Sequence, residues 1–229
     1  MAESTYSLIV FDLDGTLLDT RRDLADSANE LLVAFGGAPL PVEAVVGMVG
    51  EGARVLVERV FAAAGLAPPP DAAVARFLEI YDRRLFDFTR PYAGIADVLP
   101  VLAAHWPLAV LTNKPQKPAD RLLEHFGFRR YFRRVIGGDS AWPRKPAPDA
   151  LLALAREAGV PPDATLLIGD SRIDHETARN ARTGICVARY GFGWDRFPQD
   201  ALTGRELLID EPGELPEKLW RRASDHLAS

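Results

Sequence analysis

The 229 residues are 48% hydrophobic and 26% charged, values typical of a globular protein large enough to bury a substantial core. The 27 basic and 32 acidic residues leave a net charge of −5, and no apolar run approaches the ~18 residues of a membrane span, so we expect neither a nucleic-acid nor a membrane partner. The single cysteine, Cys186, cannot form an internal disulfide, and the first residues lack the basic start of a secretory signal, which together predict a cytoplasmic location.

The first predicted element is a buried strand that ends in two carboxylates. Leu8–Phe11 is a short apolar run, as expected for a strand covered on both faces of a sheet. Asp12 and Asp14 follow it directly. Because alternate residues of an extended segment point the same way, about 6–7 Å apart, both carboxylates can converge on one ligand. The stretch therefore suits a hard divalent cation and a phosphoryl group, with a solvated Asp-Gly turn as the alternative.

The residues after Thr20 predict only helices. Apolar residues recur at helical spacing from Leu24 to Phe35. Further helices are expected over Pro41–Val46, over Ala53–Ala64, and from an N-cap at Asp71 to about Phe86. We expect residues 21–89 to form an inserted, all-helical cap domain, and residues 1–20 and 90–229 to form the core domain.

From Pro91 onward, predicted strands alternate with predicted helices. The strands are expected at Leu108–Leu111, Val135–Ile136, Thr165–Ile168, Ile185–Ala188 and Leu207–Ile209. The helices are expected around Leu99 and Leu102, and over Pro118–Phe126, Ala150–Ala158 and Asp174–Arg182. Such alternation predicts an α/β fold with a Rossmann-like, mostly parallel sheet and right-handed crossovers.

Two later strands also end in polar residues. Thr112 and Asn113 follow one of them, and Asp170 follows another. Each alone is equally well explained as a helix cap, but carboxyl ends of parallel strands meet at one edge of the sheet, so together they predict a single site. Lys145 precedes Pro146, which favours an extended loop there. This lysine is either a solvated surface charge or the counter-charge of that site.

These stretches resemble the four motifs of the haloacid dehalogenase-like phosphatases. Asp12–Thr16 is similar to the first motif, Thr112 to the second, Lys145 to the third and Gly169–Asp174 to the fourth, so that the resemblance covers nearly the whole chain. Other stretches resemble the phosphoglycolate phosphatase branch of that family: Val49–Arg54, Phe88–Gly94, Leu111–Pro115, Gly137–Ser140 and Arg144–Pro146. Three places depart from the usual pattern, namely Trp142, Arg182–Thr183 and Tyr190–Trp194.

The resemblance implies a magnesium-dependent phosphomonoesterase. Asp12 would attack phosphorus and form an aspartyl-phosphate, and Asp14 would act first as general acid and then as general base. Mg²⁺ would bind the side chains of Asp12 and Asp170 and the backbone carbonyl of Asp14. The remaining site residues implied by the resemblance are Thr112, Asn113 and Lys145 on the phosphoryl oxygens, Gly15 and Thr16 in the nucleophile loop beside the substrate, and Asp174 as a support for Lys145 or for a metal-bound water.

The expected substrate is a small phosphorylated metabolite, with 2-phosphoglycolate preferred. Within Gly50–Arg54 the glycines permit a close backbone approach, and the Arg54 fork suits a carboxylate. The alternative for Arg54 is a solvated arginine on a cap helix. The competing functions are a phosphatase or phosphomutase acting on another small metabolite, such as a sugar phosphate, and a phosphate-binding module without activity. The oligomeric state is expected to be monomeric or homodimeric.

Overall fold

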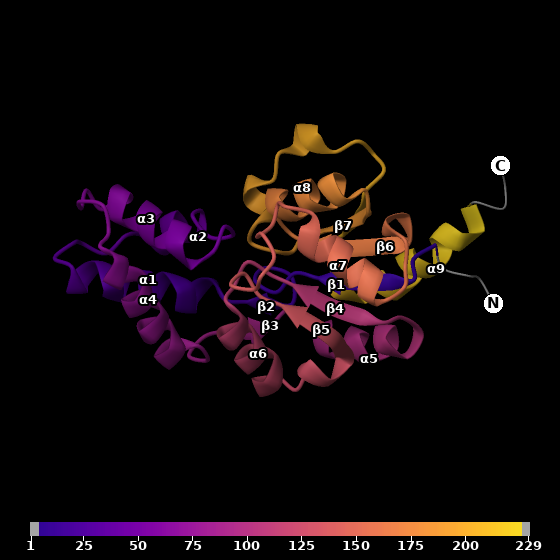
Figure 1. The fold of residues 1–229 in the computed structure, drawn as a ribbon, viewed down its shortest axis with the longest axis horizontal. Helices are drawn as coiled ribbons and strands as arrows, with labels where there is room; N and C mark the ends of the chain where they lie inside the picture. Colours follow the sequence, from indigo (N-terminus) through magenta and orange to yellow (C-terminus); the bar gives the residue numbers. More distant parts are fainter. Residues whose placement is uncertain (1–4, 226–229) are drawn as a thin grey trace.

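Two groups of secondary structure lie side by side along the long axis of the molecule (Figure 1). The structure is a computed structural model and describes residues 5–225. One group contains only helices, namely α1 (Arg21–Ala34), α2 (Val42–Val46), α3 (Ala53–Ala63) and α4 (Asp71–Arg84). The other contains a six-stranded sheet with helices on both faces. Among the described residues, none of the helices has both the length and the apolar character that a bilayer crossing requires.

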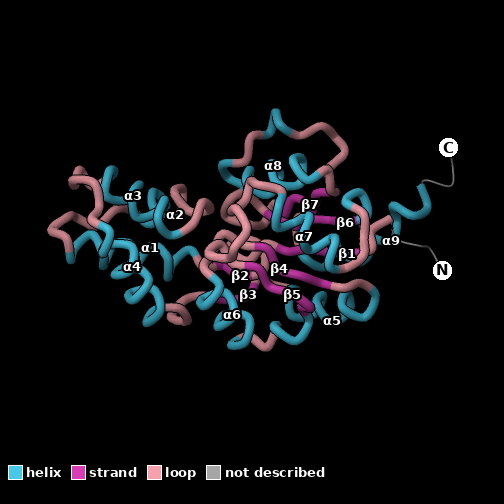
Figure 2. The backbone as a smooth tube through the Cα atoms, in the orientation of Figure 1, coloured by secondary structure: helices cyan, strands magenta, loops and turns pink. Residues whose placement is uncertain are grey.

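The sheet is parallel throughout its six strands. In spatial order it consists of β5 (Phe132–Ile136), β4 (Leu108–Leu111), β1 (Leu8–Phe11), β6 (Thr165–Gly169), β7 (Gly184–Ala188) and β8 (Leu207–Ile209). Each neighbouring pair is parallel, and Figure 2 shows the strands in magenta between helices. The predicted Rossmann-like, mostly parallel α/β core is confirmed. The first strand of the chain lies at the centre of the sheet.

The strands alternate their side chains between two apolar layers, as the period of two in a β-strand requires. Ile9 and Phe11 of β1 face one layer, and Leu8 and Val10 face the other. The first layer includes residues of α5 (Ile95–His105), α6 (Gln116–His125) and α9 (Leu215–Asp225). The second includes residues of α7 (Asp149–Glu157) and α8 (Arg172–Ala181). Burial on both faces explains why β1 reads as an unbroken apolar run.

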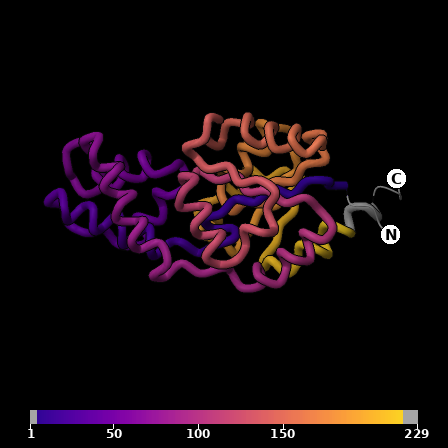
Figure 3. Tube along the Cα trace, turned by 60° about the horizontal axis from the view of Figure 1, so that its bottom comes forward, coloured from indigo at the N-terminus to yellow at the C-terminus, as the bar shows by residue number. Residues whose placement is uncertain are grey.

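The chain leaves and rejoins the sheet-containing group through one short ribbon. Strands β2 (Leu18–Asp19) and β3 (Arg90–Pro91) pair antiparallel. Next to this ribbon the Asp23 carboxylate accepts hydrogen bonds from the backbone of Phe88 at 2.9 Å and from the backbone and hydroxyl of Thr89 at 2.8 and 2.7 Å. The outgoing and returning segments are thus joined to each other. In Figure 3 the chain between them forms a separate lobe, coloured indigo to purple.

Several predicted boundaries differ from the structure by one to three residues, and two of these differences have a local reason. Asp71 is the first residue of α4, and Pro70 occupies the N-cap position, without a side-chain cap. Strand β5 begins at Phe132 rather than at Val135. The exposed Arg133 and Arg134 in its middle interrupt the apolar run from which the strand was predicted. Charged side chains are tolerated there since β5 is the edge strand of the sheet.

Candidate active site

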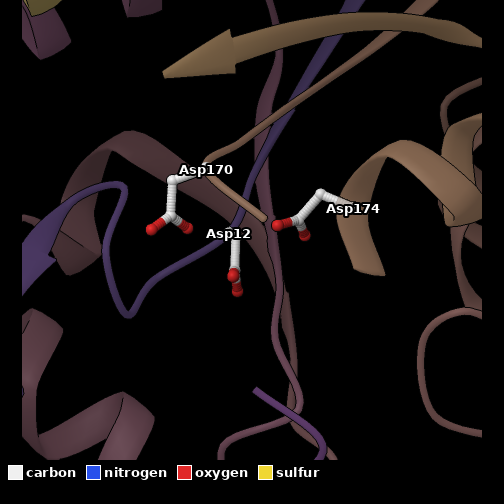
Figure 4. A group of neighbouring side chains, drawn as sticks. All are labelled: Asp12, Asp170 and Asp174. Carbon is white, nitrogen blue, oxygen red and sulfur yellow. The ribbon is translucent and has the colours of Figure 1, made fainter. Parts of the chain in front are cut away.

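Three polar residues meet at the carboxyl edge of the sheet. Asp12 is the first residue after β1, Thr112 the first after β4 and Asp170 the first after β6, and these three strands are neighbours at the centre of the sheet. Asp174 lies in the first turn of α8. Oxygen atoms of Asp12, Asp170 and Asp174 all lie within 4.8 Å of one another. Figure 4 shows Asp174 reaching from its helix toward Asp12, with Asp170 beside them.

Lys145 is the cation at the centre of this cluster. Its Nζ lies 2.9 Å from Oδ1 of Asp12 and 2.6 Å from Oδ1 of Asp174, and only 4% of the residue is exposed. Burial by itself would lower the pKa of the Lys145 ammonium, but Asp12 and Asp174 outweigh it and raise that pKa above its usual value. Lys145 therefore stays charged beside the carboxylate of Asp12.

Asp174 is held by the helix that carries it. The N-cap residue Ser171 donates to Oδ2 of Asp174 from its hydroxyl at 2.6 Å and from its backbone N–H at 3.2 Å. The backbone bond is one half of the capping box at the start of α8. The other oxygen of Asp174, Oδ1, accepts the Lys145 bond. One carboxylate thereby fixes both the start of α8 and the direction of Lys145.

The environment of the carboxylates fits a divalent cation. Burial raises the pKa of Asp12 to about 7, although Lys145 opposes the shift. Burial also raises the pKa of Asp170 well above its usual range, and the facing carboxylates of Asp174 and Asp12 raise it further. Three carboxylates face one ammonium, so a bound divalent cation would leave the cluster electrically neutral. All-oxygen donors of this kind suit Mg²⁺.

Asp170 is positioned by the loops on either side of it. The backbone N–H of Gly193 donates to Oδ2 at 2.7 Å, and the Thr16 hydroxyl lies 3.4 Å from Oδ1. Gly15 has a φ of +86°, and a Cβ placed on it would lie 2.0 Å from Oδ2 of Asp170. Glycine is therefore required there, both for the positive φ and for the close approach of the loop after β1 to Asp170.

Asp14 points to a different set of partners. Lys114 Nζ lies 2.9 and 3.0 Å from its two carboxylate oxygens, and the Thr20 hydroxyl donates to Oδ1 at 2.8 Å. The Lys114 ammonium also lies 4.5 Å from the centre of the Tyr81 ring of α4. The Asp14 side chain is thus held between the sheet edge and the helical group, apart from the Asp12, Asp170 and Asp174 cluster.

Asn113 joins the helical group to the Lys145 loop. Its side-chain amide donates to the carbonyl of Gly50 at 2.9 Å and to the carbonyl of Lys145 at 2.9 Å. The hydroxyl of the preceding Thr112 accepts from the backbone N–H of Lys114 at 3.2 Å. These hydrogen bonds therefore fix three consecutive residues after β4, namely Thr112, Asn113 and Lys114.

A pocket of about 200 Å³ opens at this edge of the sheet. Five predicted site residues line it: Asp12, Asp14, Thr112, Asn113 and Asp170. The helical group contributes mostly apolar residues and glycines, among them Leu24, Gly50, Gly52, Leu56, Phe77 and Tyr81. The pocket is therefore charged on the sheet side and largely apolar on the other.

The other predicted site residues lie outside the pocket lining. Lys145 and Asp174 contact Asp12 or one another, and Gly15 and Thr16 contact Asp170. Arg54 stands apart: its side chain is 56% exposed and lies 3.8 Å from Asp71. The structure does not bring Arg54 together with the other site residues, and its pairing with a substrate carboxylate stays a prediction.

Lys114 was not among the residues that the sequence analysis selected. It stands two residues after Thr112 in a non-helical segment, a spacing that can bring both side chains to one side of the chain. This spacing was the available signal. No sequence signal pointed to Tyr81, which contacts Lys114, because an aromatic residue at helical spacing is typical of the hydrophobic core.

A comparison with known proteins shows to which family the chain belongs. A family profile described as haloacid dehalogenase-like hydrolase matches residues 9–188. The chain belongs to this family. All the predicted site residues, from Asp12 to Asp174, lie within the matched range, and as a member of the family the chain is a hydrolase.

Individual relatives agree with this assignment. Phosphoglycolate phosphatase 1 of Pseudomonas aeruginosa is 38% identical over 91% of this chain and 78% of its own length. Phosphoglycolate phosphatase of Rhodospirillum rubrum is 42% identical over 80% of this chain and 80% of its own length. A crystal structure from Haemophilus somnus, described as a predicted phosphoglycolate phosphatase, matches with a TM-score of 0.85 at 28% identity, over 94% of this chain and 98% of its own.

Proposed function

We propose that the protein is a magnesium-dependent phosphomonoesterase that hydrolyses 2-phosphoglycolate through an aspartyl-phosphate on Asp12. The observation that carries the proposal is the setting of Asp12, which lines the pocket at the end of the central strand with Lys145 Nζ 2.9 Å from its carboxylate. A carboxylate so placed can attack phosphorus, while a cation beside it offsets its repulsion from an anionic ester.

The neighbouring residues fit the other roles of such a reaction. Asp14 lines the same pocket and would give a proton to the leaving alkoxide and then take one from the attacking water. Thr112, the amide of Asn113 and Lys145 would hold the phosphoryl oxygens. Asp174 would keep Lys145 in place through their 2.6 Å contact.

The carboxylates of Asp12 and Asp170, with the backbone carbonyl of Asp14, would hold Mg²⁺. When bound, this ion supplies positive charge that draws the anionic ester toward the anionic nucleophile. The support for this assignment is the three-carboxylate cluster and its burial.

The proposed substrate and cap follow from two further observations. Relatives that match most of this chain bear the name phosphoglycolate phosphatase, and the pocket is lined partly by residues of the helical group. We assign residues 21–89 to a cap domain that selects the substrate, and residues 1–20 and 90–229 to the core domain that performs the chemistry.

The test is a screen of small phosphomonoesters with the purified protein in Mg²⁺ and in EDTA. We expect phosphate release in Mg²⁺ only, with the highest kcat/KM for 2-phosphoglycolate and lower values for glucose 1-phosphate and p-nitrophenyl phosphate. Release of free phosphate separates a hydrolase from a mutase, which would return the group to the substrate. The absence of phosphate release from every ester would overturn the proposal.

The metal assignment is tested by Asp170→Ala. Removing a carboxylate ligand should weaken the apparent affinity for Mg²⁺ at least 10-fold, because losing even an outer partner of a metal ligand costs about 10- to 100-fold. Activity should recover in part at high Mg²⁺. Titration calorimetry with Mg²⁺ measures the affinity directly, and an unchanged affinity in Asp170→Ala would show that the metal ligands are other residues.

A further inference from the structure

The pocket is lined by one buried basic side chain that has no role in the reaction proposed above. Among the described residues that line it, four carry a basic side chain: Arg59, Lys114, Arg172 and Arg196. The side chain of Lys114 is 2% exposed, whereas those of Arg59 and Arg172 are 40% and 56% exposed, and Arg196 is also exposed. Of these four side chains, Lys114 is therefore the buried cation that an anion bound in the pocket would contact.

The three arginines are each bound elsewhere. Arg59 pairs with Glu51 and bonds the Met48 carbonyl at 3.2 Å. Arg172 pairs with Glu176, one turn further along α8, at 2.9 Å. Arg196 donates to the carbonyl of Glu43 at 2.9 Å. None of these contacts points an arginine at Asp14, where the leaving group of the ester must lie.

The chemistry of the substrate places its second charge close to that point. A proton donor acts within about 2.6–3.2 Å of the oxygen that it protonates, so the ester oxygen must come next to Asp14. In 2-phosphoglycolate the carboxylate is joined to the ester oxygen through a single carbon atom. A cation in contact with Asp14 therefore lies within reach of that carboxylate. Lys114 Nζ, at 2.9 and 3.0 Å from the two oxygens of Asp14, meets this condition.

We propose that Lys114, rather than Arg54, binds the carboxylate of the substrate and so selects 2-phosphoglycolate over uncharged phosphate esters. The inference rests on the proposed function. Without substrate, Lys114 pairs with Asp14. When substrate binds, its carboxylate takes the place of Asp14 on the ammonium. The freed Asp14 carboxylate then takes up a proton from water and can pass it to the ester oxygen, while Thr20 still holds Oδ1 through its 2.8 Å bond.

The surroundings of Lys114 strengthen such an exchange. The Tyr81 ring lies 4.5 Å from the ammonium, and Phe77 and Leu24 line the same pocket. An ion pair is screened less beside apolar walls than in water, and an ammonium left without a partner there is costly. The pocket thus favours an ester that brings its own carboxylate over one that offers a methyl or an aryl group.

The experiment compares Lys114→Met with the wild type on two esters in Mg²⁺. Ethyl phosphate differs from 2-phosphoglycolate by a methyl group in place of the carboxylate, and both have an alkoxide leaving group that needs the same proton. A charge-assisted contact contributes about 1.5–3 kcal/mol, so kcat/KM of Lys114→Met for 2-phosphoglycolate should fall about 10- to 150-fold. The fall on ethyl phosphate should be much smaller.

A binding measurement separates recognition from proton transfer. The pair 3-phosphonopropionate and propylphosphonate carries no cleavable ester, so Asp14 has no proton to give. Calorimetry should show that Lys114→Met loses affinity for the first ligand and keeps its affinity for the second. Lys114→Arg should retain the wild-type preference because it retains the charge. The matched control is Lys117→Met, the same substitution at an exposed lysine, which should leave both affinities unchanged.

The outcomes distinguish this inference from the proposed function. If Lys114→Met loses the same factor on both esters and both phosphonates, Lys114 serves only to position Asp14, and the inference is overturned. A wild-type enzyme that cleaves both esters equally well would overturn it too, while the phosphatase assignment stands. If no ester is cleaved, the proposed function fails, and the phosphonate affinities of wild type and Lys114→Met still decide whether Lys114 recognises a carboxylate.

Discussion

At Asp12 the fold surrounds a carboxylate with conditions that oppose its charge. The residue is 8% exposed, and burial raises its pKa to about 7 from an ordinary 3.8. The nucleophilic role proposed for Asp12 requires the ionised carboxylate, so neighbouring positive charges have to stabilise that form. Lys145 supplies part of it, and a divalent cation would supply the rest.

This setting makes the stability of the metal-free protein depend on pH in a defined direction. Between pH about 4 and about 7, folded Asp12 keeps a proton that the unfolded chain has lost, so the free energy of unfolding falls as pH rises through this range. Thermal unfolding in EDTA should show this fall, and Asp12→Asn should show a smaller one. Mg²⁺ should raise the melting temperature of the wild type at pH 8. Equal pH profiles for wild type and variant would contradict this prediction.

Asp12→Asn tests the nucleophile itself. The amide has nearly the same shape but does not attack phosphorus, so kcat should fall about 10⁴-fold or more, as when a nucleophile is removed from other hydrolases. The fold should remain, which circular dichroism and the melting temperature will show. Trapping of an acyl-phosphate in the variant, or a kcat near that of the wild type, would refute the assignment of Asp12.

At the scale of elements, Asp23 connects the start of α1 to the segment that returns from the helical group. It is 1% exposed, and its carboxylate accepts bonds from Phe88 and Thr89. Asp23→Ala would leave these buried donors without an acceptor, so the free energy of unfolding should fall by about 2–4 kcal/mol. Urea unfolding measures it.

The control for Asp23→Ala lies one turn further along the same helix. Asp26 pairs with Arg22, whose side chain is 57% exposed, and exposed pairs contribute at most about 1 kcal/mol. Asp26→Ala should therefore leave the free energy of unfolding nearly unchanged. Equal effects of the two substitutions would mean that α1 matters only as a helix, and not as an anchor for the returning segment.

Elements with strong periodicity or continuous apolar runs could be predicted from the sequence. The strands Leu8–Phe11, Leu108–Leu111 and Leu207–Ile209 have the predicted bounds. The ribbon of β2 and β3 was missed, because its two-residue strands are too short to show an alternation. Helix α9 was missed as well. The ribbon belongs to a part of the chain where tertiary contacts, rather than a local pattern, decide the structure. In α9, by contrast, Leu215 and Leu219 do recur at helical spacing.

The features of the site also fall into those that the sequence predicts and those that it does not. Residues that directly follow a buried strand, such as Asp12 and Asp170, were predicted to converge because the topology of a parallel sheet requires it. The pairing of Asp14 with Lys114 was not predicted, because it depends on side-chain directions around a turn. The contact of Lys114 with Tyr81 joins residues from different parts of the fold, which a single sequence does not reveal.

At the scale of the whole molecule, the helical group and the sheet meet around the pocket. Asn113 donates to the carbonyl of Gly50 across this boundary, while Asp23 and the β2–β3 ribbon join the two connections. We expect the helical group to close over a bound substrate and exclude water during the first displacement, since its two connections lie side by side and can act as a hinge.

Hydrogen exchange with and without a phosphate analogue in Mg²⁺ tests this motion. Amides of Gly50–Arg54 should exchange at least 10-fold more slowly with the analogue, because closure shields them and adds about 1.4 kcal/mol or more to local opening. Peptides from α7, which packs on the sheet away from the pocket, serve as the internal reference. Identical exchange at residues 50–54 in both states would indicate a static arrangement.

The β2–β3 ribbon has a consequence for how this enzyme can diversify. Leu18 faces Pro91 and Asp19 faces Arg90, so the polypeptide enters and leaves the helical group at points about 5 Å apart. A segment whose ends are so close behaves as a cassette: it can be lengthened, replaced or reduced to a hairpin turn without altering the order of the sheet strands. The cassette contributes to the pocket lining, so a change in it alters one side of the pocket while Asp12 and the residues around it keep their places at the sheet edge.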